Sequence, residues 1–247
     1  MSISISNQAL ININTFASIN INSAFISSFV TAGLLVSLDA SNLTSYPGSG
    51  SSWNDLSGNG NTTTLVNNPT FSTDVGGSII FDGSNDYANV PVPTVNSFNT
   101  ITVSGWIKWL SLGNDMFLGM STYDVWTQSN TLGFNNGASN VIGINAATVS
   151  SLGLLGNWKY YTFIMNKTGL LSTNKIYING TSTGPLTAVV ANDGNIPGFN
   201  TNIRLASWNN GGFNGNLQYA NLQVYNRELT AQEVMQNYLA MKSKFGL

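Results

Sequence analysis

The chain has 247 residues, of which eight are Lys or Arg and ten are Asp or Glu, so charged residues make up only 7%. A net charge of −2 without a basic run leaves nothing to neutralise a phosphate backbone or an anionic lipid surface, which excludes nucleic acid and membrane headgroups as expected partners. Polarity comes instead from 36 Asn, 29 Ser and 23 Thr, a composition typical of strands and turns. With 42% hydrophobic residues, the chain can bury a sizeable core.

The sequence contains no Cys and no His. Thiol nucleophiles, disulfides, Cys/His zinc sites and imidazole bases are therefore excluded. The first residues lack a basic region and interrupt their apolar pairs with Ser or Asn, so they do not resemble a signal peptide. We expect synthesis in a cytoplasm without a leader. The longest apolar stretch, residues 29–36, is too short to span a bilayer and predicts no membrane insertion.

An eight-residue repeat opens the chain as ISISNQAL, ININTFAS and ININSAFI, starting at Ile3. Each octad begins apolar-polar-apolar-polar, the pattern of a strand with one buried face. The face carries Ile3, Ile5, Ile11, Ile13, Ile19 and Ile21. We interpret residues 1–33 as an extended or strand arm for anchoring or oligomerisation on identical subunits or a larger assembly. Two alternatives stay open: a strand or two that completes the main domain, and disorder.

Strand-length apolar segments separated by Gly, Asn, Pro and Asp clusters follow from Leu34 onward. In most of these segments apolar residues recur at every second position, which predicts an antiparallel two-sheet sandwich. The segments are 34–40, 78–83, 87–92, 100–109, 116–121, 158–166, 174–180, 202–207 and 217–226. Trp106 and Trp109 stand three positions apart, which places them on opposite faces of one strand. Residues 34–247 are the predicted main domain.

One convincing helix is predicted, near residues 231–243. Thr230 and Glu233 form a capping box, and Leu229 can pack against Val234 as a hydrophobic staple. We also expect tight turns at Gly83, after Asp82, and at Asn179-Gly180.

Seven segments in order resemble the laminin-G-like jelly rolls of the concanavalin A-like lectin and glucanase superfamily. They are LLVSLDA, SYPGSGSSWNDLSGNGN, GGSIIFDGSNDYANVP, ITVSGWIKW, NWKYYTFIMN, NKIYINGT and FNGNLQYANLQVYNRELTAQEVMQNY. The resemblance covers about Leu34 to Tyr238 and implies an all-β, two-sheet antiparallel jelly-roll sandwich with one short C-terminal helix. The octads are not part of that pattern.

Glycoside hydrolases of this superfamily need two carboxyl groups across the scissile bond. The chain has only two Glu, Glu228 and Glu233, and both lie at the entrance of the terminal helix. Asp115 and Asp124 are the one mid-chain pair that could flank a cleft. Ser has no imidazole to activate it. We therefore predict that the protein is not an enzyme and has no catalytic residues.

Calcium is the one metal that the sequence could hold. Oxygen-bearing side chains alternate in DLSGNGN, starting at Asp55 and including Asn59, although the acidic ligand expected at the twelfth position is Val66. The resemblance often implies a structural calcium ion, with Asp82 and Asp86 as further donors. The alternative, which we favour, is that these residues form Asx-turns whose side chains bond backbone amides.

Two segments are predicted to be loops that combine exposed aromatic side chains with amide side chains, which suit the apolar faces and hydroxyls of sugars. They contain Tyr123, Asp124 and Trp126, and Trp208, Asn209, Asn210 and Asn214. Core packing is the alternative for these aromatics, and we expect a structural role for Phe213.

The leading hypothesis is a non-catalytic bacteriophage virion protein, of the capsid-decoration or tail-appendage type, that displays a lectin-like jelly roll and is attached through its N-terminal arm. Its expected partners are other virion proteins or identical subunits, and a cell-surface glycan. Its expected place is the virion surface. Two alternatives stay open: a free bacterial carbohydrate-binding or adhesion module, extracellular or at the cell surface, and a decoration protein without a ligand.

Overall fold

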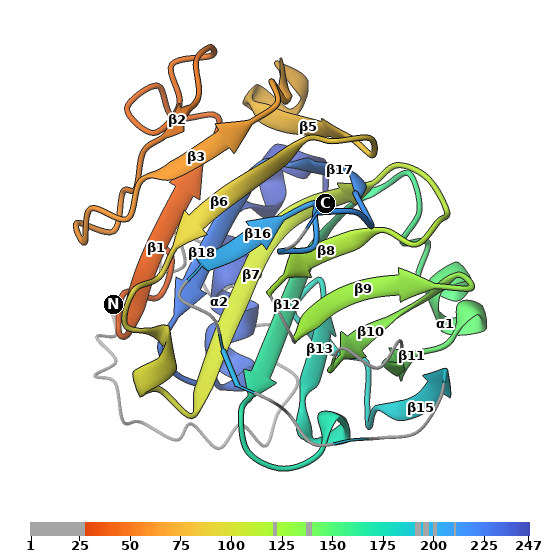
Figure 1. Cartoon of the computed structure of the whole chain (residues 1–247). Coiled ribbons are helices and arrows are strands. Elements are labelled where there is room, and N and C mark those ends of the chain that lie inside the picture. Colours follow the sequence, from red (N-terminus) through yellow and green to blue (C-terminus); the bar gives the residue numbers. More distant parts are fainter. Residues whose placement is uncertain are drawn as a thin grey trace, which may run out of the picture.

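The computed structural model describes residues 28–120, 123–136, 140–190, 194, 198–199, 202–209 and 211–247. These residues form two antiparallel sheets packed face to face (Figure 1). The strands are β1 (Leu34–Asp39), β2 (Ser52–Trp53), β3 (Thr63–Val66), β4 (Thr70–Ser72), β5 (Ser78–Asp82), β6 (Tyr87–Pro91), β7 (Thr100–Trp109), β8 (Met116–Gly119), β9 (Asp124–Gln128), β10 (Thr131–Asn135), β11 (Val141–Ile144), β12 (Trp158–Asn166), β13 (Lys175–Ile178), β14 (Thr181–Ser182), β15 (Thr187–Val190), β16 (Asn202–Leu205), β17 (Asn216–Tyr219) and β18 (Asn221–Tyr225). The helices are α1 (Ala146–Ser151), α2 (Ala231–Met241) and the 3₁₀ turns η2 (Asp74–Gly76), η3 (Val95–Ser97), η4 (Leu171–Thr173) and η5 (Lys242–Phe245).

The first sheet has the strand order β14-β13-β12-β7-β17-β5-β4, with β18 paired to both β7 and β1. The second sheet has the order β15-β11-β10-β9-β8-β16-β6-β3-β2. The main core lies between them and includes Trp53, Trp109, Phe117 and Phe163, all buried. The predicted jelly-roll sandwich is therefore confirmed.

The outer face of the first sheet is covered by α2 and η5. Trp106 points to this face, where its ring stacks on Phe245 with centroids 3.8 Å apart and also packs near Tyr238. Trp109, on the other face, belongs to the main core. The expectation of opposite faces is confirmed, and a neighbouring element covers Trp106. No helix in the described part of the chain is long and apolar enough to cross a membrane.

The predicted strand at residues 217–226 is divided into β17 and β18 at Ala220, which corrects the sequence analysis. The Ala220 amide donates to Trp106 O at 3.0 Å, and the Asn221 side chain accepts from Trp106 N at 3.0 Å. The Asn221 carbonyl oxygen lies 2.5 Å from where a Cβ on Gly105 would stand. Because Gly105 on β7 has no side chain, the backbone at Asn221 can approach β7 closely. The chain changes its second partner at this point, since β17 pairs with β5 and β18 pairs with β1.

Two local predictions are confirmed and one is incomplete. The capping box of Thr230 and Glu233 is present, and Asn179 and Gly180 both have positive φ, of 52° and 79°, as a tight hairpin requires. The terminal helix was the one helix predicted, but the structure also contains the short α1. Asn145 caps it by accepting from the Thr148 amide at 2.9 Å.

Candidate functional site

Three aromatic side chains meet on the outer side of the second sheet, and we call Trp126, Trp208 and Phe213 the aromatic rim. Trp126, from β9, packs with Met116 and Val141 outside the main core. Its ring contacts Phe213 edge to face, with centroids 5.3 Å apart and planes at 85°. The centroids of the Trp208 and Phe213 rings are 6.3 Å apart, and the ring planes meet at 67°.

Phe213 is the exposed member of the rim, with 47% of its surface accessible. It has a positive φ of 49°, a conformation that is strained for a bulky residue. Backbone hydrogen bonds hold it there: Met116 N donates to Phe213 O at 3.1 Å, and Trp208 N donates to Gly212 O at 3.2 Å. Phe213 was predicted to have a structural role and not to be a site residue, because the sequence carries no pattern that indicates its positive φ or its exposure.

Trp208 and Phe213 belong to the loop at residues 208–214, between β16 and β17, which we call the rim loop. The polar residues predicted in this loop differ in what the structure shows of them. Asn214 Nδ2 donates to Ser84 O, so this amide ties the rim loop to the β5–β6 turn. Asn209 is half-buried in the loop, and Asn210 lies outside the described residues. Arg204, in β16, donates through Nη1 to Trp208 O at 3.2 Å and lies 4.3 Å from the centroid of the Tyr87 ring. The rim loop is thus attached to both neighbouring strands.

The segment from Tyr123 to Trp126 is not an exposed loop, and this expectation is wrong. Tyr123 is fully buried, its ring stacks on Phe199 at 5.7 Å, and its hydroxyl accepts from Asn174 Nδ2 at 2.5 Å. Trp126 has only 3% of its surface exposed. The reason is the alternation of β9: Tyr123 and Val125 face the main core, while the rim loop covers Trp126.

The two mid-chain carboxyl groups are both internal. Asp124 accepts from Met120 N at 2.7 Å and from Asn135 Nδ2 at 3.1 Å, and burial raises the pKa of its carboxyl to about 7. Asp115 accepts from Trp109 Nε1 at 2.8 Å and from Asn216 N at 3.0 Å, and burial raises its pKa as well. Their oxygens are directed at structural donors inside the protein.

Both glutamates are engaged at the entrance of α2, as the sequence predicts. Glu228 pairs with Lys175 at 2.5 Å, and Glu233 pairs with Arg227 at 2.6 Å while closing the capping box. The Arg227 guanidinium lowers the pKa of Glu233 to about 2. Neither glutamate is therefore placed across a cleft from a second carboxyl group.

Asp55 and Asn59 bond the protein's own backbone. Asp55 Oδ1 accepts from Ser37 N and Ser57 N, each at 2.9 Å, and Oδ2 accepts from Asn61 N at 3.0 Å. Asn59 Nδ2 donates to the Leu34 carbonyl at 3.0 Å. N–H groups directed at the carboxylate oxygens occupy the lone pairs that a cation needs, so this set does not fit calcium.

Asp82 and Asp86 lie apart from that set, in the β5–β6 turn. Asp82 accepts from Ser84 N at 2.8 Å, which lowers its pKa, while burial and the charge of Asp82 raise the pKa of Asp86. Gly83 has a positive φ of 74°, as predicted for the turn. Among the described residues, no three acidic side chains gather to hold a metal. A calcium site stays a prediction.

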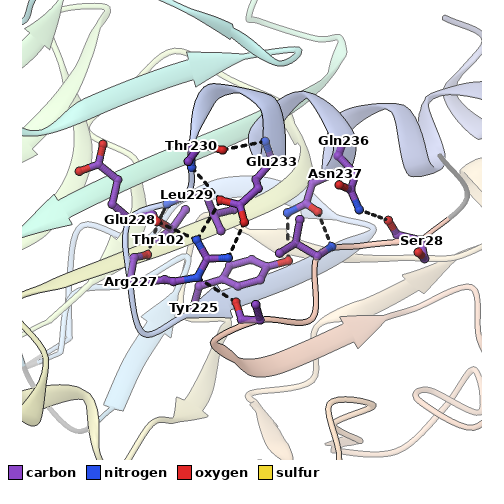
Figure 2. Close-up of polar contacts among 12 residues, drawn as sticks. Ser28, Thr102, Tyr225, Arg227, Glu228, Leu229, Thr230, Glu233, Gln236 and Asn237 are labelled. Carbon is purple, nitrogen blue, oxygen red and sulfur yellow. Dashed lines mark hydrogen bonds and ion pairs between the residues drawn. The ribbon is translucent and has the colours of Figure 1, made fainter. Parts of the chain in front are cut away.

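Residues 28–33, which we call the arm base, are fastened to α2 (Figure 2). Val30 N donates to Asn237 Oδ1 at 2.8 Å, and Gln236 Nε2 donates to Ser28 O at 3.1 Å. Arg227 Nε donates to Ala32 O at 3.0 Å. The sequence analysis assigned this segment to the arm, but it packs with the jelly roll. The octads, including Ile3, Ile5, Ile11, Ile13, Ile19 and Ile21, lie outside the described residues.

The model of a laminin-G family, described as the concanavalin A-like lectin/glucanases superfamily, matches residues 82–235, more than half of the chain. The chain belongs to this superfamily. No curated protein sequence matches it significantly. The rim loop lies inside the region that matches the superfamily model, whereas the arm base and Asp55 lie outside it.

Several solved structures share the superfamily fold. The binding domain of botulinum neurotoxin serotype D matches with a TM-score of 0.59 and 16% identity, over 85% of this chain and 52% of that one. The binding domain of botulinum neurotoxin DC in complex with SialylT matches with a TM-score of 0.61 and 18% identity, over 85% of this chain and 52% of that one. Trypanosoma rangeli sialidase matches with a TM-score of 0.60 and 16% identity, over 88% of this chain and 34% of that one. The chain therefore spans about half the length of the toxin domains, and at these identities the likeness concerns the fold alone.

Proposed function

We propose that the protein is a non-catalytic structural or adhesion protein of a bacteriophage virion, made in the host cytoplasm. Its lectin-like jelly roll is displayed on the virion surface as a capsid decoration or tail appendage. The octad arm attaches it to other virion proteins or to identical subunits. Support comes from the superfamily membership, the low charge and the Ile-rich repeat that precedes the jelly roll in the sequence.

The absence of catalysis in this proposal is supported by the carboxyl groups. A glycosidase places two carboxyl groups at roughly 5–9.5 Å across the scissile bond, where substrate can reach them. Asp115 and Asp124 have only 4% and 1% of their surfaces exposed, and each is held by structural donors. Glu228 and Glu233 are paired with cations. These four carboxyl groups are therefore engaged by partners within the protein itself, which supports a role without catalysis.

A hydrolysis assay tests this part directly. We expect no turnover of β-glucans, galactans, chitin oligomers or sialosides above the buffer rate. Turnover that is lost in Asp115→Asn or Asp124→Asn would contradict the proposal, since it would assign catalysis to the carboxyl groups that the fold buries.

Phe213 carries the proposal that the displayed domain binds a cell-surface glycan. Backbone hydrogen bonds hold Phe213 in its strained conformation, and the rings of Trp126 and Trp208 contact its ring. A half-exposed aromatic ring fixed in this way is a stacking platform for the apolar face of a sugar. Asn209 and Arg204 bring polar groups to the same loop. Neighbouring structures contain SialylT and sialic acid as ligands of those proteins, so sialylated glycans belong in the test.

Binding to a panel of neutral and sialylated glycans, measured for the wild type and Phe213→Ala, tests the platform. We expect Phe213→Ala to weaken binding at least tenfold, because stacking on an aromatic ring is lost, while stability changes by about 1 kcal/mol or less. Leu43→Ala is the matched control, since Leu43 is 76% exposed on another loop. Equal loss in both variants, or unchanged binding in Phe213→Ala, would contradict the rim as the site. No binding by the wild type would favour the ligand-free decoration role.

A further inference from the structure

A groove of about 650 Å³ lies between the β13–β14 hairpin and α2. Tyr177, Met235 and Leu239 give it an apolar lining, and Gln232 and Gln236 add amide groups. None of its lining residues is charged. The hairpin and the helix touch at its floor, where the Met235 side chain fills the place that a Cβ on Gly180 would take.

One wall of the groove is a sheet edge. β14 ends the first sheet, and in the described part of the chain it pairs with β13 alone. An unpaired edge presents backbone groups to which an extended peptide can add as a further strand. The groove therefore offers the backbone groups of a short edge, Thr181 and Ser182, beside an apolar surface for alternate side chains.

The chain itself supplies a segment that matches this groove. The arm base reaches it, because Gln236, which lines the groove, donates to Ser28 O at 3.1 Å. Residues 1–27 contain no charged residue, like the groove lining, and the octad ININSAFI at 19–26 alternates apolar and polar side chains at its start. At about 3.3 Å per residue, five or six extended residues match the roughly 16 Å of the 11-residue helix α2.

We propose that the octad at residues 19–26 of the same chain binds in this groove, as a strand on the β14 edge with Ile19 and Ile21 against Met235 and Leu239. A tether of a few residues gives the octad a millimolar effective concentration at the groove, which favours the chain's own octad over that of another copy. The inference rests on the proposed function: docking of this octad sets where the first two octads leave the domain toward their partner.

Hydrogen exchange followed by mass spectrometry tests the docking in the full-length chain. Exchange at residues 19–26 is measured at two protein concentrations, one at which light scattering detects only monomers and one tenfold higher. We expect exchange at least tenfold slower than the unstructured-chain rate at both concentrations. Leu239→Lys and Gln232→Lys should abolish this protection, because each places a charge in the groove. Leu112→Lys is the matched control, because Leu112 is half-exposed and does not line the groove.

The outcomes separate this inference from the function on which it rests. Protection that survives both groove variants, or exchange at the unstructured rate in the wild type, would overturn the docking, even if the protein still assembles. Protection only at the higher concentration would also overturn it and make a second copy's octad the occupant. If the protein does not assemble but residues 19–26 are protected as expected, the attachment proposal fails while the docking stands. Gln232 is exposed, so its variant should keep a cooperative melt.

Discussion

At the scale of single residues, Asp124 links folding to pH. Burial disfavours its charged form, so the pKa of its carboxyl rises from 3.8 to about 7 on folding. The folded state therefore holds this proton between these two values, whereas the unfolded chain has released it. Its contribution to stability is fully present below about pH 4 and is lost as pH rises through about 7. The pKa values of Asp86 and Asp115 are raised in the same direction.

We expect the free energy of unfolding to fall between about pH 4 and pH 8, with Asp124 contributing on the order of 2–4 kcal/mol of that fall. In Asp124→Asn the free energy of unfolding should fall clearly less steeply with pH, because the asparagine side chain does not titrate in this range. Urea unfolding across this range measures it, and the slope rather than the absolute stability is compared. The wild-type slope retained in the variant would show that Asp124 does not titrate in the neutral range.

The hydrogen bonds of the Asp55 carboxylate lead to a second prediction at the scale of residues, which concerns calcium. Backbone N–H groups bond both of its oxygens, so we expect the melting temperature to be the same in calcium and in a chelator. A structural ion would instead stabilise the folded state by about 2.7 kcal/mol at a hundred times its dissociation constant. A melt that rises with calcium, and no longer does so in Asp55→Asn, would restore the calcium site.

At the scale of elements, the arm base and α2 depend on Asn237. Its fully buried amide accepts from Val30 N at 2.8 Å and donates to the Tyr225 hydroxyl at 2.9 Å. We expect Asn237→Ala to cost about 2–4 kcal/mol, because it leaves two buried polar groups without partners. Gln236→Ala, which removes one exposed hydrogen bond to Ser28, should cost less than about 1 kcal/mol. Denaturant unfolding measures both, and equal costs would contradict this role of Asn237.

Strands were predictable from the sequence where apolar and polar residues alternate and turn residues bound the alternating segment. β7 and β12 match the segments predicted at 100–109 and 158–166, and the Asn179-Gly180 turn was found because both residues accept positive φ. The break at Ala220 was missed, since it depends on Gly105 in a strand that is distant in sequence. β9–β11 were missed because each has only four or five residues, and Gly133 and Gly143 interrupt the pattern of side chains in β10 and β11.

The site was less predictable than the fold for a related reason. Composition identified the segments around Trp126 and Trp208, and the structure brings both into the aromatic rim. Exposure could not be read from the sequence: Tyr123 and Asp124 are buried, whereas Phe213 is exposed. Which aromatic faces solvent depends on how the rim loop covers β9, and that is a contact between distant segments.

At the scale of the whole molecule, the two ends of the domain are joined on one side. The arm base bonds Asn237 and Gln236 of α2 and also Arg227, which precedes that helix, so Ser28 lies beside the C-terminal helix. The rim belongs to the second sheet, while α2 covers the outer face of the first sheet. The attachment and the glycan binding that we propose would therefore use different surfaces of the domain.

The central claim, attachment through the arm, is tested most directly by light scattering of the full chain and of a chain lacking residues 2–26. At about 25 cal/mol per Å², the isoleucines at positions 3, 5, 11 and 13 in the first two octads represent several kcal/mol that an isolated strand cannot recover in water. We predict that the full chain assembles and that the truncated chain is a monomer with a cooperative melt. Ile11→Asp combined with Ile13→Asp should act nearly as strongly, because both place charges at the buried contact. A full chain that is monomeric, together with a truncated chain that loses its cooperative melt, would contradict the claim and assign the octads to the domain's own sheet.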